Sequence, residues 1–108
     1  MAHLTTTRTQ TQKASRIFQQ AIEAYNEGHR YHAMQTARYA LQVARRQAPA
    51  LKSDLCGFLA LIKWELGQAN LASYYCHQAM TYLDKKSMTY GADRHYLLTL
   101  QSQIDRLN

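Results

Sequence analysis

The chain has 108 residues, with an apolar fraction of 46%, only four glycines, one proline and a net charge of +6. This length allows one small domain with a modest core, and the scarcity of chain-breaking residues excludes a fold of many short strands and tight turns. The composition therefore favours long helices.

The chain begins with a polar stretch and a first amphipathic segment. Residues 1–12 are rich in threonine and show no periodicity, which predicts a flexible polar tail. Apolar residues then recur at helical spacing from Ala14 to Tyr25. This pattern predicts a first helix over residues 12–27 that ends at Gly28, because glycine tolerates the left-handed conformation that closes many helices.

A second helix is predicted over residues 31–47, with alanines on one face, and it ends before Pro49. Alanines at so many facing positions bring two helix axes close together. A third helix is predicted over residues 51–66 and ends at Gly67. Its apolar side chains lie almost all round it, so we expect neighbours on several sides and a place at the centre of the molecule.

Two further helices complete the predicted fold. A fourth is expected over residues 70–85, and a fifth over residues 92–107. The fifth carries a single apolar stripe, as expected for a terminal helix with one buried side. The sequence therefore predicts an all-α fold of about five helices in a single domain over residues 13–108.

The region around Gly28 is repeated 39 residues later, around Gly67. Small residues stand in register on both sides of the two glycines: Ala21 with Ala60, Ala33 with Ala72, and Ala40 with Ala79. Each unit is a helix, a glycine turn and a second helix, with small residues where the two helices touch. The unit resembles the tetratricopeptide (TPR) repeat over residues 14–85, as a variant longer than the usual period of about 34.

The resemblance implies two TPR-like antiparallel hairpins stacked side by side, with a C-terminal capping helix. Two and a half units are fewer than the roughly three that usually stabilise such a stack. Either the last helix covers the open end, or a second copy of the chain or another partner covers it. A homodimer is therefore one of the assemblies we consider.

In TPR-like stacks, the first helix of each unit lines a concave groove that holds a partner peptide or helix. By position, the resemblance assigns to this groove Phe18, Ile22, Tyr25, Asn26, Asp54, Leu61, Trp64 and Glu65. Trp64 and Tyr25 are the candidate anchors, because aromatic residues dominate binding hot spots. The alternative is that both only fill the core of a small bundle. The function expected from this groove is non-catalytic protein binding, as an adaptor or small chaperone.

A second candidate surface comes from the distribution of charge. Residues 1–50 hold seven Lys and Arg against two Glu, whereas residues 51–108 hold six against five Asp and Glu. The candidate basic surface consists of Arg30, Arg38, Arg45 and Arg46, with tyrosines interleaved. Such a face suits the phosphate backbone of a nucleic acid, as in a regulatory factor. The alternative is an ordinary solvated outer face.

The sequence shows no pattern of an enzyme, a cofactor site or a metal centre. His29 and His32 lack a third ligand nearby, and Cys56 and His77 lack the strained turn and orienting acid that nucleophilic catalysis uses. No apolar run approaches the roughly 20 residues of a membrane span, and no secretory signal is present. The cysteines are expected as inert core thiols, which suits the cytoplasm.

Overall fold

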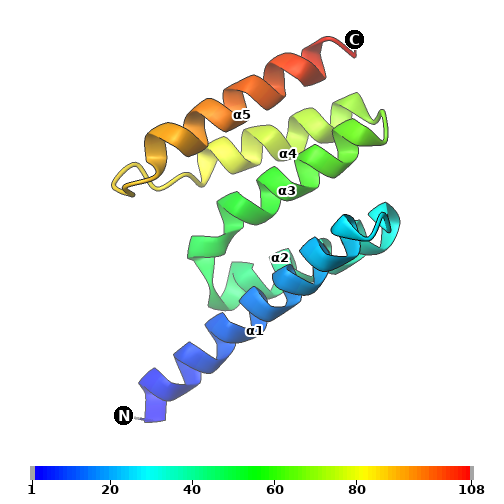
Figure 1. Ribbon diagram of the computed structural model, residues 1–108. Helices are drawn as coiled ribbons and strands as arrows, with labels where there is room; N and C mark the ends of the chain where they lie inside the picture. The colour runs from blue at the N-terminus through cyan, green and yellow to red at the C-terminus, as the bar shows by residue number, and fades with distance from the viewer. Residues whose placement is uncertain (1, 108) are drawn as a thin grey trace.

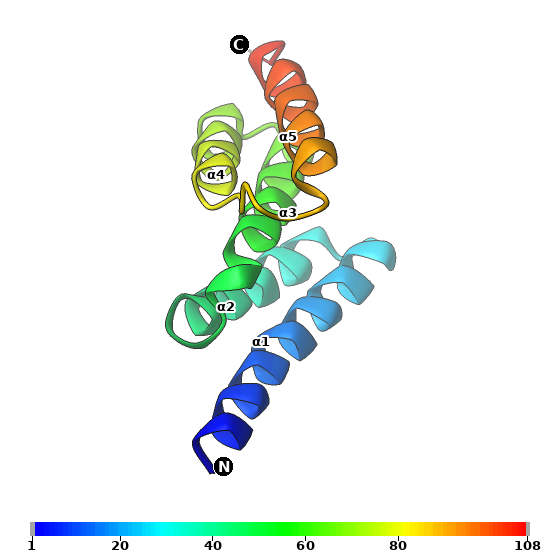
Figure 2. The same ribbon diagram turned by 90° about the vertical axis from the view of Figure 1, so that its left-hand side faces the viewer.

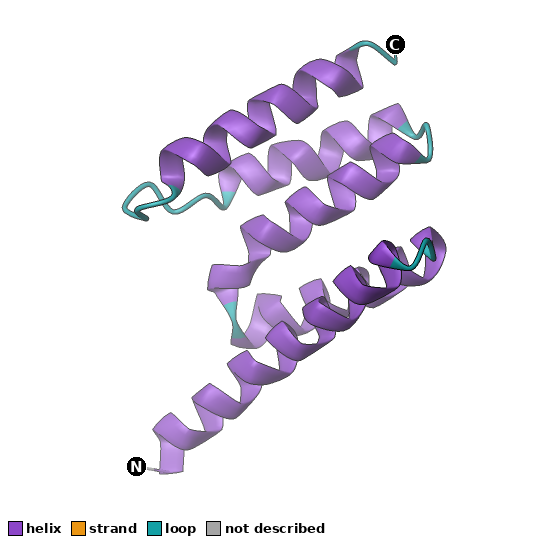
Figure 3. Ribbon diagram, in the orientation of Figure 1, coloured by secondary structure: helices purple, strands orange, loops and turns teal. Residues whose placement is uncertain are grey.

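The computed structural model describes the backbone of residues 2–107 and the side chains of residues 12–107. Within that range the chain forms five α-helices and a short 3-10 turn at Pro49–Leu51, with no strand (Figure 1; Figure 3). The helices are α1 (Ala2–Asn26), α2 (Arg30–Gln47), α3 (Lys52–Glu65), α4 (Ala69–Thr81) and α5 (Tyr90–Asp105). The predicted all-α class with about five helices is confirmed. None of these described helices combines the length and the apolarity that a membrane crossing needs.

Gly28 and Gly67 end α1 and α3 in the same way. Both have positive φ angles, 88° and 76°, in the left-handed region that favours glycine. The amide of Gly28 donates to the Tyr25 carbonyl at 3.0 Å, and the amide of Gly67 donates to the Trp64 carbonyl at 2.9 Å. In each turn the amide of the residue after the glycine donates to a second carbonyl, one residue before the carbonyl that the glycine amide bonds. This second hydrogen bond completes a Schellman cap. The two glycines therefore have equivalent structural roles.

α1 begins at Ala2, so the predicted helix start near residue 12 is wrong. The backbone of residues 2–12, which the sequence predicts as a flexible polar tail, continues the helix, and Figure 1 shows this end of α1 extending away from the other helices. The segment contains neither glycine nor proline. Threonine and glutamine disfavour a helix by only a few tenths of a kcal/mol per residue, so no residue in it forces a break.

The boundaries around the loop of residues 82–89 also differ from the prediction. α4 ends at Thr81 rather than near residue 85, so the end of the fourth helix was predicted too late. The Asp84 carboxylate accepts the amide of Lys86 at 2.9 Å, a local turn that competes with continued helix. α5 then begins at Tyr90, slightly earlier than its apolar stripe predicts.

Alanines form the close contacts within each pair of helices. The buried alanines with no exposed surface on the second helices are Ala33, Ala37, Ala40 and Ala44 of α2, and Ala72 and Ala79 of α4. α2 packs most extensively on α1, and α4 on α3, so the chain forms two helix hairpins. The expectation that Ala33 and Ala72 face neighbouring helices, rather than water, is confirmed.

α3 is the central helix, as its apolar sequence predicts. It contacts α2, α4 and α5, and its Leu55, Leu59 and Ile62 side chains are fully buried. Figure 1 shows the helices following one another from α1 at the bottom to α5 at the top, and Figure 2 shows the same order from the side. The two outermost helices, α1 and α5, therefore approach each other only across α3.

Candidate functional site

An open pocket of about 200 Å³ lies between three helices that are distant in sequence, α1, α3 and α5. We call it the α1–α3–α5 pocket, and its lining residues are Phe18, Ser53, Asp54, Gly57, Phe58, Leu61, Leu83, Asp93, Tyr96 and Leu97. The structure thus brings together three residues of the predicted groove, Phe18, Asp54 and Leu61. The other five predicted groove residues lie outside this pocket.

The floor of the pocket is aromatic and apolar. Asp54, Gly57 and Phe58 share one face of α3, because residues three and four apart in a helix are neighbours. The Phe58 ring meets the Phe18 ring edge to face, with 5.5 Å between centroids. Gly57 lies next to α5, since a Cβ at this position would be 3.5 Å from Leu97 Cδ2, an ordinary van der Waals contact. The floor of the pocket therefore includes the contact between α3 and the α5 leucine.

Two carboxylates give the pocket an acidic rim. Asp54 lies on α3 and Asp93 in the first turn of α5. Although Asp54 is exposed as a residue, partial desolvation of its carboxylate raises its pKa, and the negative charge of Asp93 raises that pKa further. Asp93 accepts a hydrogen bond from the Thr89 hydroxyl at 2.8 Å, which holds its carboxylate in place. This rim is locally acidic in a protein whose net charge is +6.

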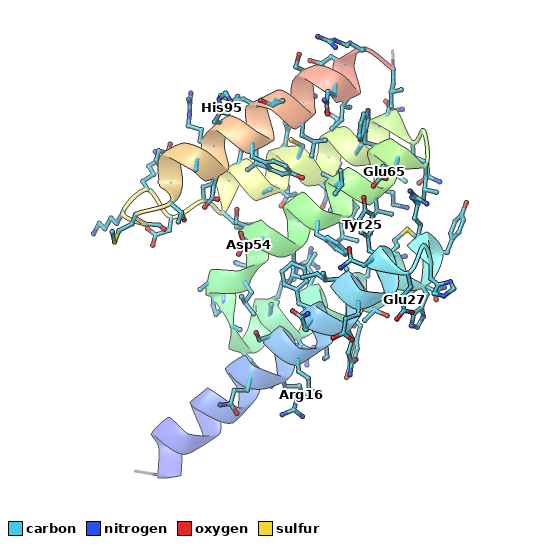
Figure 4. The ribbon with its side chains drawn as sticks, in the orientation of Figure 1. Arg16, Tyr25, Glu27, Asp54, Glu65 and His95 are labelled. Carbon is cyan, nitrogen blue, oxygen red and sulfur yellow. The ribbon has the colours of Figure 1, made fainter. Side chains whose placement is uncertain are left out.

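Tyr25 and Glu65, both predicted groove residues, form a bridge between the two hairpins. The Tyr25 hydroxyl donates to Glu65 Oε1 at 2.5 Å, and Arg30 Nη2 lies 3.2 Å from Glu65 Oε2. Figure 4 shows Tyr25 and Glu65 pointing toward each other between α1 and α3, with Asp54 nearer the opposite end of α3. The hydrogen bond to Glu65, followed by burial, raises the pKa of Tyr25 to about 12.

The three remaining predicted groove residues have separate environments. Ile22 is half-buried on α1, and Asn26 is exposed at the last position of that helix. Trp64 is half-buried and packs against the main hydrophobic core. The predicted groove is therefore divided between a pocket near the start of α3 and a hydrogen-bonded bridge near its end.

Most of the pocket lining was not predicted from the sequence. A signal existed for Gly57 and Phe58, because they share the α3 face that carries Asp54 and Leu61. The sequence held no comparable signal for the lining residues of α5, such as Asp93. A single apolar stripe shows that a helix has one buried face, but it does not show which helices cover that face.

The four predicted basic residues occupy two places. Arg30, at the start of α2, is the arginine that pairs with Glu65. Arg38, Arg45 and Arg46 are exposed on the outer face of α2, where Arg38 and Arg45 line one hollow and Arg46 lines another. The structure therefore keeps three of the four residues on one face and separates Arg30 from them.

Both cysteines are buried and unpaired, and burial raises the pKa of both thiols. The Cys76 thiol lies 3.4 Å from the Leu97 carbonyl, to which it donates. His77 is exposed. Among the residues whose side chains the structure describes, no group of three His, Cys, Asp or Glu is arranged to hold a metal ion. These thiols are protonated core side chains rather than activated nucleophiles.

No protein-family model, no curated protein and no solved structure matches this chain.

Proposed function

We propose that this chain is a non-catalytic interaction module that holds a peptide or helix of a partner protein on the face of α1, α3 and α5. The α1–α3–α5 pocket carries the proposal. It is concave, has an apolar and aromatic floor, and has a few polar groups at its rim, which is the common form of a binding site. The resemblance of the units around Gly28 and Gly67 to TPR repeats supports the same function, because that family binds peptides in a comparable groove.

The size and charge of the pocket define the partner side chain. A volume of about 200 Å³ suits one long side chain. Lysine and arginine can pack their aliphatic stems on the rings of Phe18 and Phe58 while the charged group reaches Asp54 and Asp93. A cation there also offsets the desolvation that raises the pKa of Asp54. The partner segment therefore presents Lys or Arg between apolar residues.

A module of this kind acts as an adaptor or a small chaperone, because it offers binding surface without activated chemical groups. An adaptor would join the partner to a second protein, whereas a chaperone would cover an apolar segment of the partner until that segment is assembled. The two free, buried thiols suit a reducing compartment such as the cytoplasm.

The substitution Asp54→Arg tests the proposed site. Asp54 is exposed, so the change reverses the rim charge without removing core packing. Reversing one partner of a close charge pair is expected to weaken partner binding by at least about 30-fold. We expect tagged wild-type protein to capture a partner from extracts of the source organism, and titration calorimetry with that purified partner to measure the loss.

The matched control is Asp84→Arg, which makes the same change in the exposed loop after α4. This control should bind the partner like the wild type, as should the double variant Arg38→Gln, Arg45→Gln on the outer face of α2. Equal partner affinity of the wild type and a folded Asp54→Arg protein, with circular dichroism as the check on folding, would show that the pocket is not the binding site.

A further inference from the structure

Among the side chains of residues 12–107, none that is acidic neutralises the positive charge on the outer face of α2. The helix spans Arg30–Gln47 and contains no Asp or Glu. Arg38, Arg45 and Arg46 are exposed. Within residues 12–107 the ion pairs join Glu27 to His29 and Glu65 to Arg30, so these three arginines have no carboxylate partner there. An unneutralised arginine face attracts an anionic ligand.

Two hollows lie on either side of this face, and each contains cationic side chains. The first, of about 430 Å³, lies between α2 and α4 and has Arg38 and Arg45 in its wall. The second, of about 310 Å³, lies between α2 and α1 and has Lys13 and Arg46 in its wall. Tyr39 and Gln42 line both hollows, so these two residues form the ridge between them.

The tyrosine on the ridge is accessible and lies among cations. The Tyr39 side chain is 49% exposed, and Lys13 Nζ lies 6.0 Å from the centroid of its ring. Burial and then the charge of Arg38 lower the pKa of Lys63, whose ammonium donates to the side-chain oxygen of Gln68 at 2.9 Å.

We propose that single-stranded nucleic acid crosses α2 at this point, with one base stacked on Tyr39 and the flanking phosphates in the two hollows. In this arrangement Arg38 and Arg45 hold one phosphate, and Lys13 and Arg46 hold the next. Stacking on an aromatic ring beside a basic track is the general mode by which proteins bind single strands without sequence preference. This site is separate from the α1–α3–α5 pocket and does not depend on it.

The lining favours a nucleic acid over an acidic peptide. A bound peptide helix needs an apolar groove for its anchor side chains. Apart from the tyrosines, the apolar lining residues of the two hollows are Leu41, which is buried, and Val43, which is half-buried. Glutamine and arginine side chains make up most of the remaining surface, and these donate hydrogen bonds to phosphate and sugar oxygens.

Fluorescence anisotropy with a fluorescein-labelled oligouridylate of about 15 nucleotides tests the proposal. With four cations engaged, the logarithm of the binding constant should fall with the logarithm of salt concentration at a slope of about −3. Arg38→Gln and Arg45→Gln should each reduce the size of this slope by about 0.7. The matched control is Arg94→Gln, which removes an exposed arginine of α5 and should leave the slope unchanged.

Substitutions of Tyr39 distinguish the binding of a nucleic acid from the binding of other anions. Tyr39→Leu should weaken oligouridylate binding about ten-fold, whereas Tyr39→Phe keeps the ring and should retain most of the affinity. Tyr31→Leu, at an exposed tyrosine outside both hollows, is the control and should bind normally. Asp54→Arg should also bind the oligonucleotide, so failure of the pocket proposal and failure of this one give different results.

Three results would overturn the proposal. The first is no oligouridylate binding at low salt, and the second is equal binding by the wild type and the Arg38→Gln and Arg45→Gln variants. The third is a labelled polyglutamate peptide that binds the same face more tightly than the oligonucleotide and is insensitive to Tyr39→Leu. That third result would assign the face to an acidic protein partner.

Discussion

At the scale of a single residue, Tyr25 makes contacts within the chain that its position in the sequence did not indicate. The TPR resemblance places it in a partner-binding groove, but its hydroxyl is used within the chain, where it donates to Glu65. Its ring also packs edge to face on Phe58, with 5.7 Å between centroids, and Arg30 lies 5.9 Å from its centroid. One side chain of α1 thus contacts both the start of α2 and the middle and end of α3.

The substitution Tyr25→Phe isolates the hydrogen bond, because it removes the hydroxyl and keeps the ring. We expect the free energy of unfolding at neutral pH to fall by about 1 kcal/mol, measured by urea denaturation. In a Glu65→Gln background the same substitution should cost less, because the charged acceptor is already gone. Equal costs in the two backgrounds would mean that the hydroxyl does not act through Glu65.

The same bond has a defined pH dependence. Its contribution is complete below the unfolded-state pKa of Tyr25, 10.0, and is lost as the pH rises through the folded-state pKa of about 12. The sign follows because the folded protein holds the phenol proton more tightly than the unfolded chain. The stability difference between wild type and Tyr25→Phe should therefore be smaller at about pH 11 than at neutral pH.

At the scale of the helices, the two glycine turns set where each hairpin folds back. Gly28 and Gly67 both need a left-handed backbone, although there is space for a Cβ at each position. Substitution is therefore costly because of the backbone conformation and not because of a clash. Gly91 is different, since it lies in the first turn of α5 without a positive φ and without neighbours near a Cβ.

Gly28 and Gly91 give a matched test of that argument. Gly28→Ala should destabilise the protein by about 1 kcal/mol, because alanine resists the left-handed conformation. Gly91→Ala should stabilise it by about 0.5 kcal/mol, because alanine favours the helix more than glycine does. Thermal unfolding followed by circular dichroism should show melting temperatures shifted in opposite directions. A shift in the same direction for both would contradict the assigned conformations.

Features set by local pattern were predictable from the sequence. Helical spacing and turn chemistry were enough to predict the turns at Gly28 and Gly67 and the buried stripe around Ala33. The N-terminal boundary was not predictable, because threonine and glutamine neither demand nor forbid a helix near Ala2. The end of α4 was predicted too late for a different reason. The carboxylate of Asp84 accepts a hydrogen bond from a loop amide, and hydrophobic periodicity does not indicate such a bond.

The candidate site was predicted only in part, because a binding surface depends on which helices meet. Phe18, Asp54 and Leu61 were assigned to a groove on position alone, and the structure brings these three to one pocket. To predict that Asp93 lines the pocket, one would need to know the path of the loop after α4 and the packing of α5. Neither follows from the sequence of α5 itself.

At the scale of the whole molecule, the two candidate surfaces lie on different sets of helices. The acidic α1–α3–α5 pocket uses α1, α3 and α5, whereas the basic hollows flank α2. α3 lies between the two regions, because Phe58 lines the pocket and α3 also packs against α2. A chain of 108 residues can thus offer two chemically opposite surfaces only if the two hairpins remain docked.

The docking of the hairpins should make unfolding a single transition, and Phe58 is the residue at which to test this. Its ring meets Phe18 and Tyr25 of the first hairpin. In the wild type, urea transitions followed by Trp64 fluorescence and by far-ultraviolet circular dichroism should coincide.

Phe58→Ala weakens the contact between hairpins, and neighbouring units of a stack lose cooperativity when their interface weakens. We therefore expect the dichroism of Phe58→Ala to decline at lower urea concentration than the Trp64 signal, because α1 and α2 melt first. Leu98→Ala, at an exposed leucine of α5, is the control and should keep the two transitions together. Coincident transitions in Phe58→Ala would show that the hairpins are held together by other contacts, with those between α2 and α3 as the next to be tested.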